Sequence, residues 1–319
     1  MLNRRILRLK AFKVLYGSVL SDNMSLSQAQ SQLDVACEAT RDLYVYMLGI
    51  VSPLTRLAQD RIDAAKAKFN PTEEELNPNT KFADNALAKL LDADVDFQKV
   101  FKKKKFAWEQ YDLFLKKVLN SIQSKEYYAE YMNSGKSSLA EDCKLFTRIF
   151  EEEFVDSEEL DQILEEKSLY WNDDLAYSLT WCCKTLKTFA KGESWRQLPL
   201  YQSEMMAGED VESDLAFVRK LLQASFAGYE RYSTMVSESV SGWEKDRLFS
   251  TDMVLIVMGL AEAATFPTIP LKVTINEYVE ISKFYGTPKS RSFVNGLLDR
   301  LIQKLTEEGQ IVKEGKGLL

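Results

Sequence analysis

The sequence contains no histidine, so the side chains that could contact a ligand are mainly cations and aromatic rings. Lys289, Ser290, Arg291 and Phe293 lie within five positions at the predicted start of the last helix. Free backbone amides at a helix start already favour anions. Cations neutralise phosphates and a ring face stacks on a base, which is what binding of single-stranded nucleic acid requires. The alternative is that Phe293 is simply a core residue.

A second basic cluster lies near the N-terminus, where residues 3–13 hold five cations and no acid: Arg4, Arg5, Arg8, Lys10 and Lys13. Positive charge at the start of a helix opposes the helix dipole, so helix stability alone does not favour this arrangement. We interpret Arg4, Arg5 and Arg8 as contacts to an external anion, with RNA or DNA phosphate as the candidate. The alternative is a basic, disordered start of the chain.

Other patterns that could support chemistry are weak. The absence of histidine removes the commonest general base and transition-metal ligand. The segment "NSGKSS" at 133–138 resembles a phosphate loop but has Glu130 where that motif needs glycine, and it follows a helical pattern. A polar loop between helices is predicted there. The lysine run 101–106 is predicted to be a solvated helix junction, with phosphate contact as the alternative.

The remaining candidates for metal or redox chemistry also have simpler interpretations. The carboxylates at 151–153 and 173–174 lie in an acidic helical region without supporting ligands, so a solvated face is favoured over a metal site. The four cysteines include no C-x-x-C pair, which indicates reduced core thiols. We therefore predict no catalytic residue, no metal site and no cofactor, and we expect that the protein is not an enzyme.

Composition and charge indicate a water-soluble protein with an uneven surface. The 319 residues are 45% hydrophobic and 28% charged, and no apolar run reaches the ~18 residues of a membrane span. No secretory signal is found, so a cytoplasmic location is expected. The net charge is −7, but residues 141–174 carry 13 acids against three bases, leaving about +3 elsewhere. We expect residues 141–174 to stay off nucleic acid.

Helical periodicity runs through almost the whole chain, and no stretch alternates like a strand, so an all-α fold is predicted. Irregular connections are expected at 70–81 and 192–210, and the tail after residue 308 is expected to be partly disordered. The predicted helices span 3–20, 26–51, 52–68, 82–98, 106–132, 138–167 with a break near 155–156, 173–191, 211–226, 228–242, 251–265, 274–285 and 288–308.

The last two helices carry sharp local signals. Thr274 and Glu277 have the spacing of a capping box, which predicts a helix start at Thr274. Gly286 is placed to end that helix with a positive φ. Thr287 followed by proline predicts the next start. The apolar stripe of the last helix must be buried, and it consists of Val294, Leu297, Leu298, Leu301, Ile302 and Leu305.

The segment "IPLKVTINEYVEISKFYGTPKSRSFVNGLLDRLI" resembles the C-terminal signature of the NusB family of transcription antitermination factors. The matching positions are Lys272, Val273, Ile275, Asn276, Glu277, Glu280, Ser282, Lys283, Ser290, Phe293, Val294, Asn295, Gly296, Leu298 and Asp299. The N-terminal "RRILRLKAFKVLY" is similar to the arginine-rich first helix of that family, through Arg4, Arg5, Arg8, Leu15 and Tyr16. Residues 214–265 are compatible with its middle helices.

This resemblance implies NusB-like helical bundles with additional inserted helices. It divides the chain into a basic first helix at 1–20, a helical elaboration at 21–209 and a C-terminal helical domain at 210–319. It further implies binding of boxA-type single-stranded RNA together with NusE, a small-subunit ribosomal protein, within the RNA polymerase antitermination complex of ribosomal RNA operons.

Three alternatives to this function remain open from the sequence. The chain could be a helical protein-interaction scaffold, or an RNA-binding accessory to ribosomal RNA maturation without antitermination activity. An RNA methyltransferase with a NusB-like domain is a further rival, but it would need a parallel-sheet cofactor domain with a glycine-rich turn. The sequence has neither signal.

Overall fold

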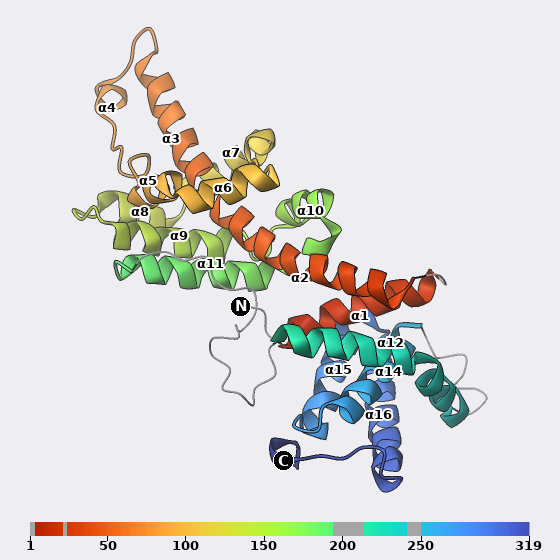
Figure 1. Ribbon diagram of the computed structural model, residues 1–319. Helices are drawn as coiled ribbons and strands as arrows, with labels where there is room; N and C mark the ends of the chain where they lie inside the picture. Colours follow the sequence, from red (N-terminus) through yellow and green to blue (C-terminus); the bar gives the residue numbers. More distant parts are fainter. Residues whose placement is uncertain (1–3, 22–23, 194–213, 241–249, 319) are drawn as a thin grey trace. The chain divides into compact units, whose positions relative to one another are not determined.

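The computed structural model describes residues 4–21, 24–193, 214–240 and 250–318 (Figure 1). All regular elements within these ranges are helices, so the all-α prediction is confirmed. The chain divides into two compact units, which are described separately below. Unit 1 comprises residues 1–37 and 198–319, and unit 2 comprises residues 38–197. The division falls within α2 (Leu26–Leu48).

Unit 1 is organised around α14 (Ser250–Thr265), whose residues from Val254 to Ala263 are all buried. Such a helix, apolar on every side, must be surrounded by other helices. It packs against the four other long helices of the unit, namely α1 (Arg4–Leu20), α12 (Asp214–Ser239), α15 (Leu271–Tyr285) and α16 (Ser290–Glu307). The predicted stripe of α16 is buried, as its spacing requires.

Two sequence predictions in unit 1 differ from the structure. The predicted pair of helices around residue 227 is one helix, α12, in which the ring of Tyr232 covers Gly228 so closely that a Cβ atom would lie 2.7 Å from it. The tail is described through Leu318 and is packed. Ile311 is buried, the amide of Glu314 donates to the carbonyl of Pro267, and η3 (Gly315–Leu318) follows.

The capping-box prediction at Thr274 is also wrong. Helix α15 begins at Leu271, directly after Pro270, and the amide of Thr274 already makes a helical bond to the carbonyl of Pro270. The hydroxyl of Thr274 donates to the buried carboxylate of Glu262 instead. A local capping signal was therefore replaced by a contact to a distant helix, which sequence spacing cannot reveal.

Gly286 ends α15, but not in the predicted left-handed conformation, since its φ is −103°. The position needs glycine because of close approach. A Cβ atom would lie 2.4 Å from Cβ of Ser290 and 2.7 Å from the carbonyl oxygen of Ser282. The absence of a side chain therefore allows the start of α16 to lie tightly against the end of α15.

Unit 2 is a set of shorter helices around an aromatic core. The ring of Tyr46 stacks on Trp108 at 4.3 Å and meets Trp171 at 5.2 Å. The predicted break near 155–156 is confirmed, because it separates α9 from α10. The elements are α3 (Val51–Lys66), α4 (Glu73–Leu76), α5 (Ala86–Ala93), α6 (Val95–Lys104), η1 (Glu109–Tyr111), α7 (Asp112–Gln123), α8 (Glu126–Asn133), α9 (Leu139–Glu153), α10 (Glu158–Lys167), η2 (Leu169–Trp171) and α11 (Leu175–Ala190).

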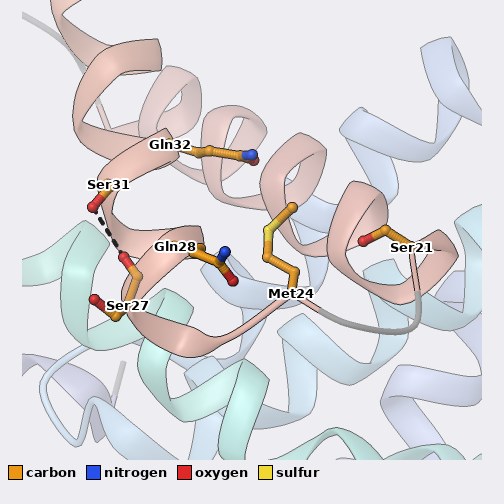
Figure 2. A pocket seen from close by; sticks show the side chains of 6 residues that line it. All are labelled: Ser21, Met24, Ser27, Gln28, Ser31 and Gln32. Atoms are coloured by element: carbon orange, nitrogen blue, oxygen red, sulfur yellow. Dashed lines mark hydrogen bonds between the residues drawn. The ribbon is translucent and has the colours of Figure 1, made fainter.

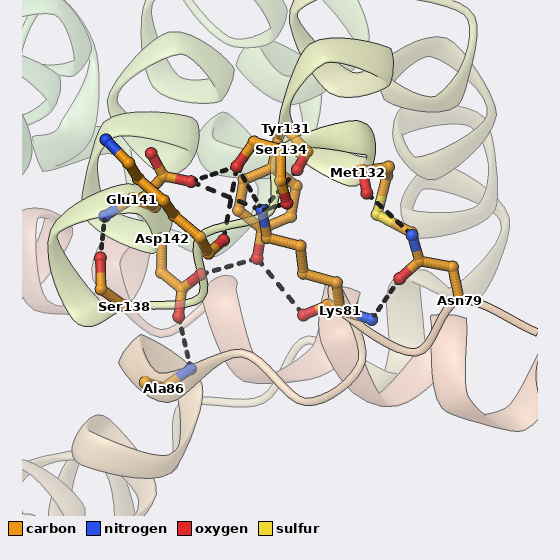
Figure 3. A network of polar contacts seen from close by, with 10 residues as sticks. Asn79, Lys81, Ala86, Tyr131, Met132, Ser134, Ser138, Glu141 and Asp142 are labelled. Carbon is orange, nitrogen blue, oxygen red and sulfur yellow. Dashed lines mark hydrogen bonds and ion pairs between the residues drawn. The ribbon is translucent and has the colours of Figure 1, made fainter.

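The segment 70–81, predicted to be a linker, is ordered by a polar network (Figure 3). Thr72 and Glu75 form a capping box that starts α4. The ammonium group of Lys81 donates to Oγ of Ser134 at 2.9 Å and lies 3.4 Å from Glu141. The "NSGKSS" segment is confirmed as a loop between α8 and α9. Its serines serve structural roles, since Ser138 caps α9.

All four cysteines are buried free thiols, as predicted. Burial raises the pKa of the Cys183 thiol to about 11, so this group is held in the unreactive protonated form. Within the described ranges, none of the helices has both the length and the apolar character that crossing a bilayer requires.

Candidate nucleic-acid interface

Arg8 lies at the centre of a buried polar cluster in unit 1. Its guanidinium group donates two hydrogen bonds to the carboxylate of Glu262, at 2.7 and 2.8 Å. Thr274 and Tyr278 donate to the same carboxylate at 2.8 and 3.0 Å. Burial acts to lower the pKa of Arg8, but the bonds and attraction of Glu262 outweigh it and raise that pKa. Arg8 is only 3% exposed, so this cluster holds α1, α14 and α15 together.

The two preceding arginines of α1 also have carboxylate partners. Arg5 donates two bonds to Glu277, at 2.8 and 2.9 Å, and its side chain is 56% exposed. This bidentate pair lowers the pKa of Glu277. Arg4 lies 3.4 Å from Asp214, and its guanidinium group covers the ring of Phe217 at 4.6 Å. The charges of both arginines are therefore partly neutralised within the unit.

The start of α16 presents cations in a different setting. Lys289 and Arg291 are exposed, and no carboxylate within 4.0 Å of either is found among the described residues. Phe293, one turn on, is half-buried and lines a pocket of about 530 Å³ together with Lys289. Because both charges project from a helix start, this surface is suited to bind an anion attached to a flat ring.

Ser290 lies beneath this surface rather than on it. Its side chain is buried, and its hydroxyl donates to Oδ2 of Asp252 at 2.8 Å and accepts from the amide of Thr287 at 2.8 Å. Ser290 therefore fixes the turn between α15 and α16 and so sets the direction in which Lys289 and Arg291 project.

One residue of each basic cluster acts electrostatically on the same carboxylate, that of Glu280. Glu280 on α15 has a lowered pKa, caused first by its hydrogen bond to Lys283 and then by the positive charges of both Arg5 and Arg291. Two guanidinium groups that act on one carboxylate must each lie within electrostatic range of it.

Sequence reasoning missed two acids that position this surface, Asp252 and Glu262. Both are fully buried, Asp252 in the first turn of α14 and Glu262 within its apolar run. A signal was available, because a carboxylate in such a run must find a partner or a function. Oδ2 of Asp252 has Ser290 as its partner, whereas Oδ1 is buried and has no hydrogen-bond partner in the described part of the chain.

A second hollow of unit 1 lies where α1 leads into α2 (Figure 2). Its side chains are serines, glutamines and one methionine, and Ser31 donates to the carbonyl of Ser27 at 3.0 Å. None of the residues that line it carries a charge. This hollow therefore lacks the cations that phosphate binding requires, and it does not compete with the start of α16 as a candidate site.

Comparison with known proteins finds a family to which the C-terminal part of the chain is similar. Residues 187–303 match the sequence model of the NusB family. The chain is similar to proteins named transcription antitermination protein NusB from Chloroherpeton thalassium (33% identity, 35% of this chain and 54% of the relative) and Salinibacter ruber (32%, 32% and 64%). The protein of that name from Alkaliphilus oremlandii is 25% identical over 35% of this chain and 80% of its own. The similarity thus spans only 54% and 64% of the first two relatives. No solved structure matches.

Proposed function

We propose, from the premise that residues 187–303 form a NusB-family domain, that this chain is an RNA-binding transcription antitermination factor and not an enzyme. In the finer form of the proposal, it binds boxA-type single-stranded RNA together with NusE within the RNA polymerase antitermination complex. Residues 21–209 are then a helical elaboration between a basic first helix and the C-terminal domain at 210–319.

The observation that carries the proposal is the start of α16. Lys289 and Arg291 are exposed there, and the half-buried ring of Phe293 lines the adjoining pocket. Two cations next to an aromatic face supply the two interactions that single-stranded RNA offers, namely phosphate neutralisation and base stacking. Lys289 and Arg291 are exposed and do not fill the core, which favours a role in binding.

The other predicted RNA-binding residues take graded roles in this proposal. Arg4 and Arg5 are partly exposed and add positive potential at the edge of the surface, although each is paired with a carboxylate. Arg8 and Ser290 are buried and act as positioning residues. Arg8 anchors α1 through Glu262, and Ser290 fixes the start of α16 through Asp252.

The test is a titration of the full chain with single-stranded RNA carrying a boxA-type sequence, repeated over a range of salt concentrations. Two to four phosphate contacts predict a slope of log affinity against log salt of about −1.4 to −2.8, from about −0.7 per phosphate. Absence of binding at low salt would exclude RNA as the ligand. Binding with a slope near zero would exclude the cationic surface.

The partner proposal needs a second measurement. If NusE binds jointly with the RNA, its addition should tighten RNA binding by a coupling free energy of about 1–3 kcal/mol. Equal RNA affinity with and without NusE removes this part of the proposal. A reconstituted transcription read-through assay then separates antitermination from a role in ribosomal RNA maturation, because only the former changes termination.

One observation favours a second candidate function, a protein-interaction scaffold, for unit 2. This unit exposes several large apolar side chains, including Phe69 at 98%, Leu113 at 75% and Leu169 at 73%. Such side chains mark a protein-binding surface where they gather into a contiguous patch. The scaffold alternative predicts that the full chain captures a protein partner without RNA, and that ribonuclease treatment leaves the captured complex intact.

A further inference from the structure

The pocket at the start of α16 contains an unusual group. Asp252 comes from the first turn of α14, is 1% exposed and lines this pocket beside Phe293. Its Oδ2 atom accepts the hydroxyl proton of Ser290 at 2.8 Å. Its Oδ1 atom has no hydrogen-bond partner among the described residues. Oδ1 is therefore an unused acceptor buried in the wall of the pocket, which a ligand reaches only by displacing the atoms that cover it.

An unpaired carboxylate oxygen away from water is costly, so a folded protein seldom retains one without compensation. Burial raises the pKa of Asp252, and the bond from Ser290 only partly offsets this effect. An apolar residue of similar size would fill the space without that cost. Groups that are unfavourable for folding but lie in the wall of a pocket are typical of binding sites.

The chemistry of the pocket defines what would complete it. Oδ1 of Asp252 needs a hydrogen-bond donor, the ring of Phe293 offers an apolar surface, and Lys289 at the rim offers positive charge. A nucleotide whose base carries an exocyclic amino group supplies a donor for Oδ1, a flat ring for Phe293 and a phosphate for Lys289. Uracil is a poor fit, because it presents carbonyl oxygens where cytosine presents an amino group.

We propose that this pocket holds one base of the bound RNA and selects a base with an exocyclic amino group, which donates to Oδ1 of Asp252 while the ring lies against Phe293. The inference rests on the proposed RNA-binding function and adds a specificity to it. Asp252 is the specificity-determining residue, and Lys289 neutralises the phosphate of the selected nucleotide.

Cytosine and uracil give the sharpest comparison, because they differ mainly in whether the ring carries the amino group. The full chain is titrated with oligocytidylate and oligouridylate of equal length at one salt concentration. A hydrogen bond to a charged acceptor predicts about tenfold tighter binding of oligocytidylate. Oligomers of N4,N4-dimethylcytidine, which lack the donor, should bind the unaltered protein as weakly as oligouridylate.

The variant Asp252→Asn should abolish the preference for oligocytidylate while leaving the salt dependence of binding unchanged. Asp299→Asn, which removes an exposed carboxylate from α16, serves as the control and should keep the preference. Equal affinity of the unaltered protein for the two oligomers, or an unchanged preference in Asp252→Asn, overturns the inference alone. Failure of every oligomer to bind overturns the proposed function as well. If Asp252→Asn does not fold, the dimethylcytidine oligomer decides.

Discussion

The arginines of α1 and the cations at the start of α16 are alike in sequence but differ in their surroundings. Arg8 is enclosed and bonded twice to Glu262, and Arg5 is bonded twice to Glu277. Lys289 and Arg291 extend into solvent from a helix start. The first cluster therefore serves mainly to hold helices together, whereas the second is available to a phosphate.

This difference shows that a basic cluster cannot be assigned to RNA from charge alone. A cation that is already paired with a carboxylate must lose or share that carboxylate before it can stabilise a bound phosphate. A solvated cation at a helix start has no such partner to give up, and it releases counterions when RNA binds. We therefore expect that substitutions in the first cluster mainly lower folding stability. Substitutions of Lys289 and Arg291 should mainly lower RNA affinity.

The largest effect is expected from Arg8→Met. Removing the guanidinium group leaves the carboxylate of Glu262 buried and without its charge partner, which costs about 3–5 kcal/mol of folding free energy. Thr274 and Tyr278 still donate to Glu262, so the loss should fall toward the lower end of this range. Chemical denaturation of the full chain measures the change.

The double variant Arg8→Met with Glu262→Met supplies the control for this prediction. Replacing both partners by apolar side chains should recover much of the lost stability, because no buried charge is left unpaired. If Arg8→Met retained full stability but lost RNA binding, Arg8 would belong with the cations of α16, and the comparison would fail.

The next effect concerns Phe293→Ala, for which we expect a loss of about 1–3 kcal/mol in RNA binding, the usual range for one stacked base. The salt dependence should not change, because stacking releases no counterions. Phe284→Ala is the matched control, since this aromatic on α15 is 81% exposed and lies outside the residues that line the pocket. A thermal melt on each variant shows whether Phe293 also supports the fold. Equal affinity of Phe293→Ala and the parent would remove this ring from the site.

Arg291→Ala and Lys289→Ala should each weaken RNA binding regardless of base sequence and make the salt slope shallower by about 0.7. Neither change should alter the melting temperature, because both side chains are exposed. Lys304→Ala is the control, as it removes an exposed cation near the other end of α16. A loss in Lys304→Ala equal to that in Arg291→Ala would indicate general charge attraction in place of a site.

The helical class and most helix positions could be predicted from the sequence because they depend on local periodicity. The predictions failed where a partner distant in the chain decided the outcome. Thr274, for example, donates to Glu262 of another helix and does not cap α15. Proline and asparagine at 70–81 suggested a linker, but Lys81 joins that segment to Ser134.

The candidate site shows the same division. The types and spacing of Lys289, Arg291 and Phe293 identified this surface from local sequence. The burial of Arg8 could not be predicted from the neighbouring sequence, because its partner Glu262 lies 254 positions away in the chain. Asp252 was missed because an acid in the first turn of a helix is common and has no distinctive spacing. Only its burial and its unpaired oxygen distinguish it.

The smallest effect is expected from Arg5→Ala, which tests the intermediate case of an exposed but paired cation. Its bidentate bond lowers the pKa of Glu277 in the folded state, so the pair stabilises the fold above the ordinary pKa of glutamate. That contribution is lost as the pH falls through the lowered pKa. Because Arg5 is 56% exposed, solvent screening limits its contribution to about 0.2–1 kcal/mol.

Two measurements on Arg5→Ala then decide the role of α1. The stability difference from the parent should be present at neutral pH and vanish in acid, where Glu277 is protonated in both proteins. The salt slope of RNA binding should become shallower by less than the ~0.7 expected for a free cation, because Glu277 already neutralises part of this charge. A slope change as large as that of Arg291→Ala would mean that RNA displaces Glu277 and that α1 contributes a full phosphate contact. No change at all would confine the RNA surface to the start of α16.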